Sequence, residues 1–131
     1  MDNSQFFYRT IPFTQKDGQI SLVDLFQPEN VTPLDGWLGT VVSLADGFHT
    51  VQQMIEYMGG QYPSPPANLE KTLHSVIERL VEGEIIHLSK RVTTLAYYLS
   101  APIEELDIER ARKAAQEEGD TVSKNFDGVL H

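Results

Sequence analysis

The residues of this chain that could do chemistry are few and scattered. His74 and Glu78 lie four residues apart, a spacing that places both side chains on one face of a helix, where they could share a metal ion. No third ligand follows at motif spacing, so a solvated polar pair explains them better. His49, beside Thr50, is interpreted as a residue at the start of a helix rather than a general base, and no serine lies in a nucleophile-elbow pattern. The sequence therefore predicts no catalytic site, no metal site and no cofactor; a small enzyme is the third of three hypotheses.

The composition sets the class of protein in which a function must be sought. The chain has 131 residues, a formal net charge of −9 and no cysteine. Its length fits one domain with a tail, and the missing cysteines exclude a disulfide framework, thiol catalysis and thiolate metal sites. There is no long apolar run and no signal-like N-terminus, so we expect a cytoplasmic protein with no membrane partner.

The first two of three predicted helices follow from apolar spacing and capping residues. Residues 34–45 carry an apolar stripe with helical period, and we expect Thr32 to cap this helix and Pro33 to occupy its first position. Gly47 is expected to follow its end. A capping box from Thr50 to Gln53 then predicts the start of a second helix.

The third helix has the clearest periodicity in the chain. Apolar residues keep helical spacing over residues 69–81, and Gly83 follows as a stop. Residues 84–88 then predict a strand, which is expected to form a wing hairpin with residues 91–95. Three short helices followed by a hairpin indicate a winged helix-turn-helix.

The N-terminal part predicts a β-hairpin with arms over residues 6–11 and 20–26. The Asp17–Gly18 pair is a strong hairpin-turn signal. Pro12 cannot donate a ladder hydrogen bond, so it is expected to interrupt the first arm or to place it at an edge. Residues 27–32 are expected to form a turn and a short third strand before the first helix.

The C-terminal part differs from the rest. Residues 103–118 predict a helix with a weak apolar stripe, ended by Gly119, and the chain is expected to fray from Asp120 onward. A surface helix and a dimer arm are both compatible with this pattern, so a homodimer remains open. We predict an α+β fold, with a winged helix-turn-helix-like domain over residues 1–95. In it, an N-terminal hairpin or three-stranded sheet packs on three helices, and residues 96–131 add a C-terminal helical extension.

The charge of the helical region separates two kinds of partner. Residues 34–88 contain only two basic residues, Lys71 and Arg79. Opposed to them are the acidic residues Asp35, Asp46, Glu56, Glu70, Glu78, Glu82 and Glu84. A helix-turn-helix that binds DNA needs basic side chains to neutralise phosphates. A DNA-binding winged-helix regulator is therefore the disfavoured alternative, and a protein or peptide partner is favoured.

Two segments of the chain carry a resemblance to a known family. Leu44–Val51, LADGFHTV, resembles the L-x-D-G-x-x-T segment of PqqD-like proteins, and Leu80–Leu88, LVEGEIIHL, is similar to that family's L-x-x-x-G-x-I-x-L ending. Leu25–Glu29 is similar to the strand and turn that precede the family's first helix. The resemblance spans about residues 20–88. Leu34–Asp35 stands where Leu-Asn is common, and the extension after Leu88 is long, which leaves a specialised or stand-alone role open.

The resemblance implies a function in peptide maturation. Domains of this family bind the leader segment of a ribosomally made precursor peptide and present it to a modifying enzyme, in many cases a radical enzyme. The resemblance implies that the leader joins a three-stranded sheet as a further strand, beside the third helix. Apolar leader side chains would enter the groove between them, with polar residues at its rim setting preference. The expected peptide-binding residues are Val23, Leu25, Val31, Lys71, Leu73, His74 and Ile77.

Overall fold

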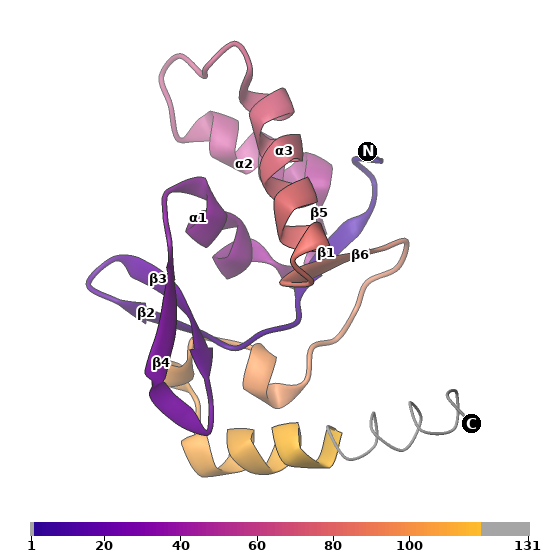
Figure 1. Ribbon diagram of the computed structural model, residues 1–131. Helices are drawn as coiled ribbons and strands as arrows, with labels where there is room; N and C mark the ends of the chain where they lie inside the picture. Colours follow the sequence, from indigo (N-terminus) through magenta and orange to yellow (C-terminus); the bar gives the residue numbers. More distant parts are fainter. Residues whose placement is uncertain (1, 119–131) are drawn as a thin grey trace.

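The computed structural model describes residues 2–118, so the expectations for Gly119 and for the chain from Asp120 onward lie outside the described residues. Helices and two three-stranded antiparallel sheets confirm the α+β class (Figure 1). The strands are β1 (Phe6–Arg9), β2 (Phe13–Lys16), β3 (Gln19–Asp24), β4 (Gln27–Leu34), β5 (Asp46–Thr50) and β6 (Ile86–Ser89). The main helices are α1 (Trp37–Leu44), α2 (Val51–Gly60) and α3 (Leu69–Glu82).

The first sheet joins parts of the chain that are distant in sequence. Its strand order is β5-β1-β6, with β1 antiparallel to both neighbours. The expected pairing of residues 6–11 with residues 20–26 is therefore wrong. Pro12 ends the run of residues that could continue β1, and the chain starts a new strand at Phe13.

The second sheet has the order β2-β3-β4 and contains the predicted hairpin turn. Asp17 and Gly18 have φ values of 52° and 80°, as a two-residue hairpin turn requires. The second arm is confirmed, but the first arm is β2 rather than residues 6–11. The third strand, β4, is longer than expected, because it includes residues 27–30 before Val31 and also Pro33 and Leu34.

That length of β4 corrects the predicted start of the first helix. α1 begins at Trp37, after Gly36 with φ of 53°, so Thr32 does not cap it and Pro33 is not its first residue. The capping box of α2 is confirmed: the Thr50 hydroxyl accepts from the Gln53 backbone N–H at 3.1 Å, and the Gln53 side chain accepts from the Thr50 N–H at 2.8 Å. The apolar stripe of α3 is also confirmed, since Leu69, Leu73, Val76, Ile77 and Leu80 are buried and Val81 is partly buried.

The expected wing hairpin is not formed. β6 pairs with β1, and the described residues 91–95 belong to no strand. Instead this connector lies against β5, where the Thr93 N–H donates to the Gly47 carbonyl oxygen at 2.9 Å. An N-terminal strand thus takes the place beside β6 that the wing was expected to fill.

The C-terminal segment, residues 96–118, covers one face of the second sheet. It contains two 3₁₀ turns, η1 (Tyr97–Leu99) and η2 (Ile103–Glu105), and a helix over residues 108–118, so the helix expected over residues 103–118 is divided. Figure 1 shows it, orange to yellow, at the end of the molecule away from α2 and α3. Arg112 Nε donates to the Leu25 carbonyl oxygen at 2.7 Å. No helix among residues 2–118 has the length and apolar character needed to cross a membrane.

The two faces of the second sheet belong to two different buried regions. One face contributes to the main cluster between the helices, which includes Phe13 and Leu34. The other face carries Ser21 and Val23, which are buried but lie outside that cluster. The main cluster consists of Phe7, Phe13, Leu34, Val41, Val42, Ala45, Val51, Met54, Met58, Leu69, Leu73, Val76, Ile77, Leu80 and Ile86.

Candidate functional site

The apolar residues expected to line a binding groove are buried in separate places. Leu73 and Ile77, on α3, have no exposed surface and belong to the main cluster. Val23 and Leu25 are also buried, but outside that cluster, at the face covered by the C-terminal segment. The structure therefore does not bring these four side chains together in one open groove.

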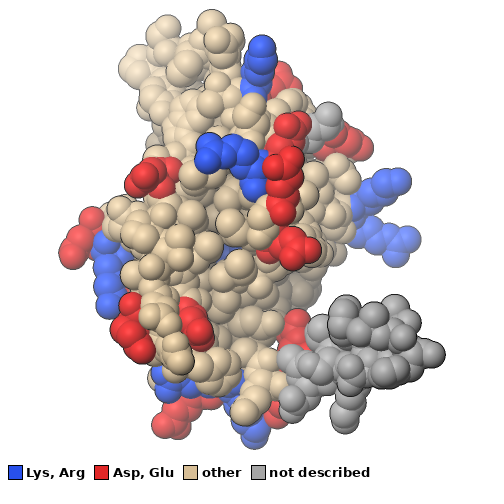
Figure 2. Space-filling model, viewed as in Figure 1, with Lys and Arg blue, Asp and Glu red and all other residues tan. Residues whose placement is uncertain are grey.

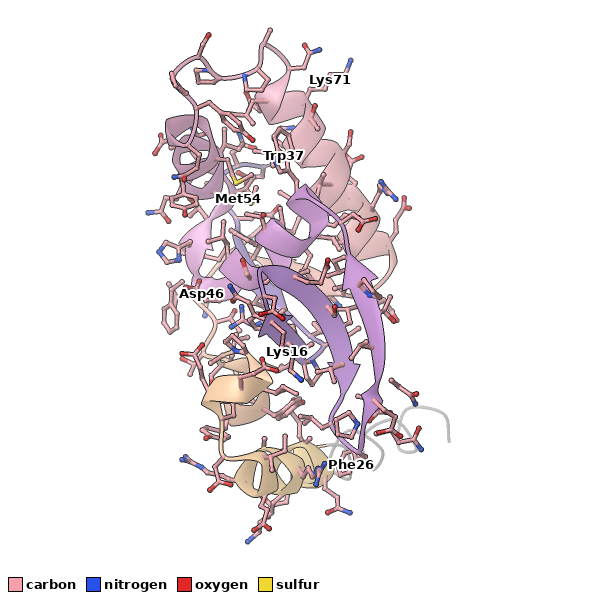
Figure 3. The ribbon with its side chains drawn as sticks, turned by 90° about the vertical axis from the view of Figure 1, so that its left-hand side faces the viewer. Lys16, Phe26, Trp37, Asp46, Met54 and Lys71 are labelled. Carbon is pink, nitrogen blue, oxygen red and sulfur yellow. The ribbon has the colours of Figure 1, made fainter. Side chains whose placement is uncertain are left out.

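The two polar residues expected at the groove rim lie elsewhere on the surface. His74 Nε2 contacts the Asn3 side-chain oxygen at 2.7 Å, and Asn3 Nδ2 donates to Glu70 at 2.7 Å, so His74 helps to hold the N-terminal segment on α3. Figure 3 shows Lys71 at one end of the molecule and Phe26, at the tip of the β3–β4 turn, near the other. Lys71 and His74 are thus structurally separate from the end of the second sheet.

Val31 is the one predicted site residue that is well exposed on a strand. It lies on β4, which has β3 on one side and no strand on the other among the described residues. The opposite edge of this sheet, β2, is partly closed, because the Gln15 N–H donates to Glu104 of η2 at 2.9 Å. The β4 edge is therefore where the second sheet can accept a further strand.

The hydrogen bonds of β3 establish which backbone groups of β4 point outward. The Val23 N–H donates to the Pro12 carbonyl oxygen at 3.0 Å, on the side away from β4. The N–H and C=O of one residue point to the same side of a strand, so the C=O of Val23 also points away from β4. Val23 therefore makes no hydrogen bond to Val31, the β4 residue opposite it, and the two form a non-hydrogen-bonded pair. The N–H and C=O of Val31 therefore point to the open edge. Pro33 lies two residues further along β4, so its backbone also faces the open edge. Its carbonyl oxygen points outward, and as a proline it has no N–H that would remain unpaired there.

Each face of the sheet has a hollow beside this edge. The hollow on the side of the helices has a volume of about 550 Å³ and includes the cross-strand pair Leu22 and Thr32 in its lining. The hollow on the side of the C-terminal segment has a volume of about 320 Å³ and includes Ser21 and Ile103. Alternate side chains of an added strand would point to these two faces in turn.

Asp46 and Gly47, in the Leu44–Val51 segment on which the resemblance rests, have structural roles in this chain. The Asp46 carboxylate accepts from the Phe48 N–H and contacts His49 Nδ1, both at 2.9 Å, and so fixes the turn into β5. Gly47 has φ of 83°, and a Cβ atom there would lie 2.1 Å from the Thr93 carbonyl oxygen. Asp46 and Gly47 are therefore explained by the fold, while Leu44 and His49 of the same segment line a hollow of about 220 Å³.

Arg9 is a buried charged residue that the sequence reasoning missed. Its side chain lies 4.6 Å above the ring of Phe13, and its Nε donates to the Leu99 carbonyl oxygen at 2.7 Å. Its Nη1 donates to the carbonyl oxygens of Val42, Ser43 and Ala45 at 3.2 to 3.3 Å. Burial lowers the pKa of Arg9 to about 10, against the opposing effect of Asp46. The sequence signal that could have identified Arg9 is its position as the one basic residue in the largely apolar run FFYRT. The role of Arg9 is structural, because its donors are used by backbone carbonyl oxygens.

The exposed surface of α3 carries charges of both signs. Lys71 and Arg79 are exposed, and so are Glu70, Glu78 and Glu82 on the same helix. Figure 2 shows basic and acidic side chains interspersed over this face of the molecule, without a continuous basic patch. A phosphate backbone would meet acidic side chains wherever it meets basic ones.

No group of three or more His, Asp or Glu side chains among residues 2–118 could hold a metal ion. No family model, no curated protein and no solved structure matches this chain.

Proposed function

We propose that this protein is a non-catalytic module that binds an extended peptide as a fourth strand on β4. The observation that carries the proposal is the outward orientation of the Val31 N–H and C=O and of the Pro33 C=O. By its resemblance to PqqD-like proteins, the peptide is the leader of a ribosomally made precursor, and the partner is the enzyme that modifies that precursor. A helix-turn-helix-like arrangement belongs to the same proposal, supported by a three-stranded sheet that precedes α1, α2 and α3, with β6 pairing with β1 in place of a wing hairpin.

Strand addition accounts for binding with few side-chain contacts. In an antiparallel complex, the peptide residue opposite Val31 exchanges two hydrogen bonds with it, and the residue opposite Pro33 donates one to its carbonyl oxygen. Each such bond stabilises a complex by about 1 kcal/mol. Backbone pairing tolerates many sequences, so selectivity must come from the side chains that enter the two hollows.

The test removes one outward donor while leaving the sheet intact. Val31→Pro eliminates the outward N–H, but the ladder between β3 and β4 does not use that N–H. Val31→Ala is the matched control, because it shortens the side chain and keeps the donor. Thr32→Pro should instead destabilise the sheet, since Thr32 pairs with Leu22 in the hydrogen-bonded phase.

The measurement is calorimetric titration with leader peptides of candidate precursors, supported by backbone amide shifts. We expect shifts along β4, and an affinity for Val31→Pro about fivefold below that of Val31→Ala, the equivalent of one hydrogen bond. Equal affinities of the two variants, or shifts confined to α2 and α3, would contradict the proposal.

The second candidate function is a DNA-binding regulator. The mixed charges on α3 and the net charge of −9 argue against it. We therefore retain peptide recognition as the function that the geometry supports best.

A further inference from the structure

The two hollows beside β4 differ in chemistry. The hollow on the helix side includes two carboxylates in its lining, Asp24 and Glu29, and no Lys, Arg or His. The Asp24 carboxylate accepts from the Phe26 N–H at 2.8 Å, which fixes its position in the β3–β4 turn. A carboxylate has further lone pairs after one such bond, so Asp24 can still accept a hydrogen bond from a cationic group.

The hollow on the side of the C-terminal segment has a more apolar lining. Pro28 and Ile103 contribute aliphatic surface to this hollow alone, whereas Val23 and Val31 line both hollows. Lys16 and Glu29 also line this more apolar hollow, and they carry opposite charges. An aliphatic side chain of a bound peptide would gain free energy there by losing contact with water. Its binding would leave no unpaired charge, because Lys16 and Glu29 carry opposite charges.

We infer that the segment taken up by β4 alternates Lys or Arg with aliphatic residues, an inference that rests on the proposed function. Side chains of a strand point to its two faces in turn, so one set would enter the helix-side hollow, which Asp24 lines, while the other set would enter the opposite hollow, which Pro28 and Ile103 line. Val23, Glu29 and Val31 line both hollows. The net charge of −9 acts in the same direction, because it favours the approach of a cationic segment.

A second copy of this chain is the main competing occupant of the edge. Pairing β4 with β4 of a second copy would bring together two chains that each carry a net charge of −9, including the carboxylates of both hollows. Like charges brought close together oppose association, so the charge argues for a cationic peptide instead.

The experiment uses short fluorescein-labelled peptides as probes of the full chain, read by fluorescence anisotropy. One peptide alternates Lys and Val, a second alternates Glu and Val, and a third has the composition of the first with Lys and Val in separate blocks. The protein variants are the pair Asp24→Asn with Glu29→Gln and, as a control with the same change in net charge, the pair Glu56→Gln with Glu82→Gln on α2 and α3.

We expect the alternating Lys–Val peptide to bind best, and the block peptide and the Glu–Val peptide to bind at least threefold more weakly. The Asp24→Asn, Glu29→Gln protein should lose roughly three- to tenfold in affinity for the Lys–Val peptide, as expected for two exposed charge pairs. The control protein should lose less than twofold, since its removed charges lie away from β4.

Three outcomes would overturn the inference. If the Lys–Val and Glu–Val peptides bind equally, or both double variants lose the same affinity, the charge pattern is wrong, while binding that still responds to Val31→Pro keeps the proposed function. If no peptide binds and Val31→Pro changes nothing, both proposals fail. If sedimentation shows a dimer that Val31→Pro dissociates, the edge belongs to a second copy.

Discussion

Arg9 and Leu99, which are ninety residues apart in sequence, are joined by a hydrogen bond of 2.7 Å from the guanidinium Nε to the carbonyl oxygen. The same guanidinium donates through Nη1 to carbonyl oxygens at the end of α1, so one buried cation links β1, α1 and the C-terminal segment. A positive charge is favourable at the C-terminal end of a helix, where unpaired carbonyl groups concentrate negative charge.

The first prediction concerns the stability that Arg9 provides. Arg9→Met should lower the free energy of unfolding by about 3 kcal/mol, because several buried carbonyl oxygens lose their donor. The measurement is urea denaturation of the full chain. Arg9→Lys keeps the positive charge but has fewer N–H donors, so its loss in free energy of unfolding should be smaller. A loss below about 0.5 kcal/mol for Arg9→Met would show that water replaces these hydrogen bonds.

The elements set by neighbouring residues could be predicted from the sequence. The capping box of Thr50 and Gln53, the turn at Asp17–Gly18 and the stripe of α3 all depend on residues within a few positions of one another. Periodicity gives no partner for a strand, however. β1 pairs with strands some forty and eighty residues away, and no local signal distinguishes those partners from β3.

The candidate site shows the same division. Val31 was expected in a short third strand before the first helix, and it lies on β4, an edge strand of the second sheet. The sequence did not show which backbone N–H and C=O groups of β4 point to the open edge. That orientation depends on the register of β4 with β3 and on the hydrogen bond from the Val23 N–H to the Pro12 carbonyl oxygen. Sequence reasoning also misread Pro33, because a proline fits the first position of a helix as well as an edge strand.

The second prediction compares two glycines with nearly equal backbone conformation. Gly47 and Gly18 have φ of 83° and 80°, but a Cβ atom would meet the Thr93 carbonyl oxygen only at Gly47. Gly18→Ala should lower the free energy of unfolding by about 1 kcal/mol, from backbone strain alone. Gly47→Ala should lose at least about 2 kcal/mol more, since backbone must move. Equal losses in thermal denaturation would mean that the connector at Thr93 is easily displaced.

The third prediction concerns removal of the C-terminal segment after Leu99. The main cluster contains no residue from 100–118, so the shortened chain should still unfold cooperatively. It should be less stable by about 2 to 3 kcal/mol, because Val23 and Leu25 lose their cover. Thermal unfolding measures both quantities. A broad, non-cooperative transition would show that the segment belongs to the core, and a change from dimer to monomer in light scattering would mark it as an oligomerisation arm.

The fourth prediction concerns nucleic acid. We expect no binding to duplex DNA at physiological salt, because phosphate contacts dominate such affinity and the charges on α3 are mixed. Anisotropy titrations with labelled duplexes of mixed sequence measure this. Binding at micromolar protein that weakens steeply with added salt would restore the regulator hypothesis. Lys71→Ala would then identify whether α3 makes the contact.

The last prediction follows from the carboxylate that covers the β2 edge. Burial raises the pKa of Glu104, but the hydrogen bonds from the Thr14 hydroxyl and the Gln15 N–H outweigh it and hold the pKa below its ordinary value of 4.5. The folded state therefore favours the ionised form. The stability that this form provides is complete above pH 4.5 and is lost as the pH falls through the lower, folded-state pKa.

Glu104→Gln should therefore be less stable than the natural chain at neutral pH, and the difference should shrink as the pH falls below 4.5. Urea denaturation across that range measures it. Glu105→Gln is the matched control, because this neighbouring carboxylate lies outside the two hydrogen bonds to β2, and its effect should not vary in the same way. A difference for Glu104→Gln that stays constant through the acid range would show that the carboxylate does not hold the β2 edge through its charge.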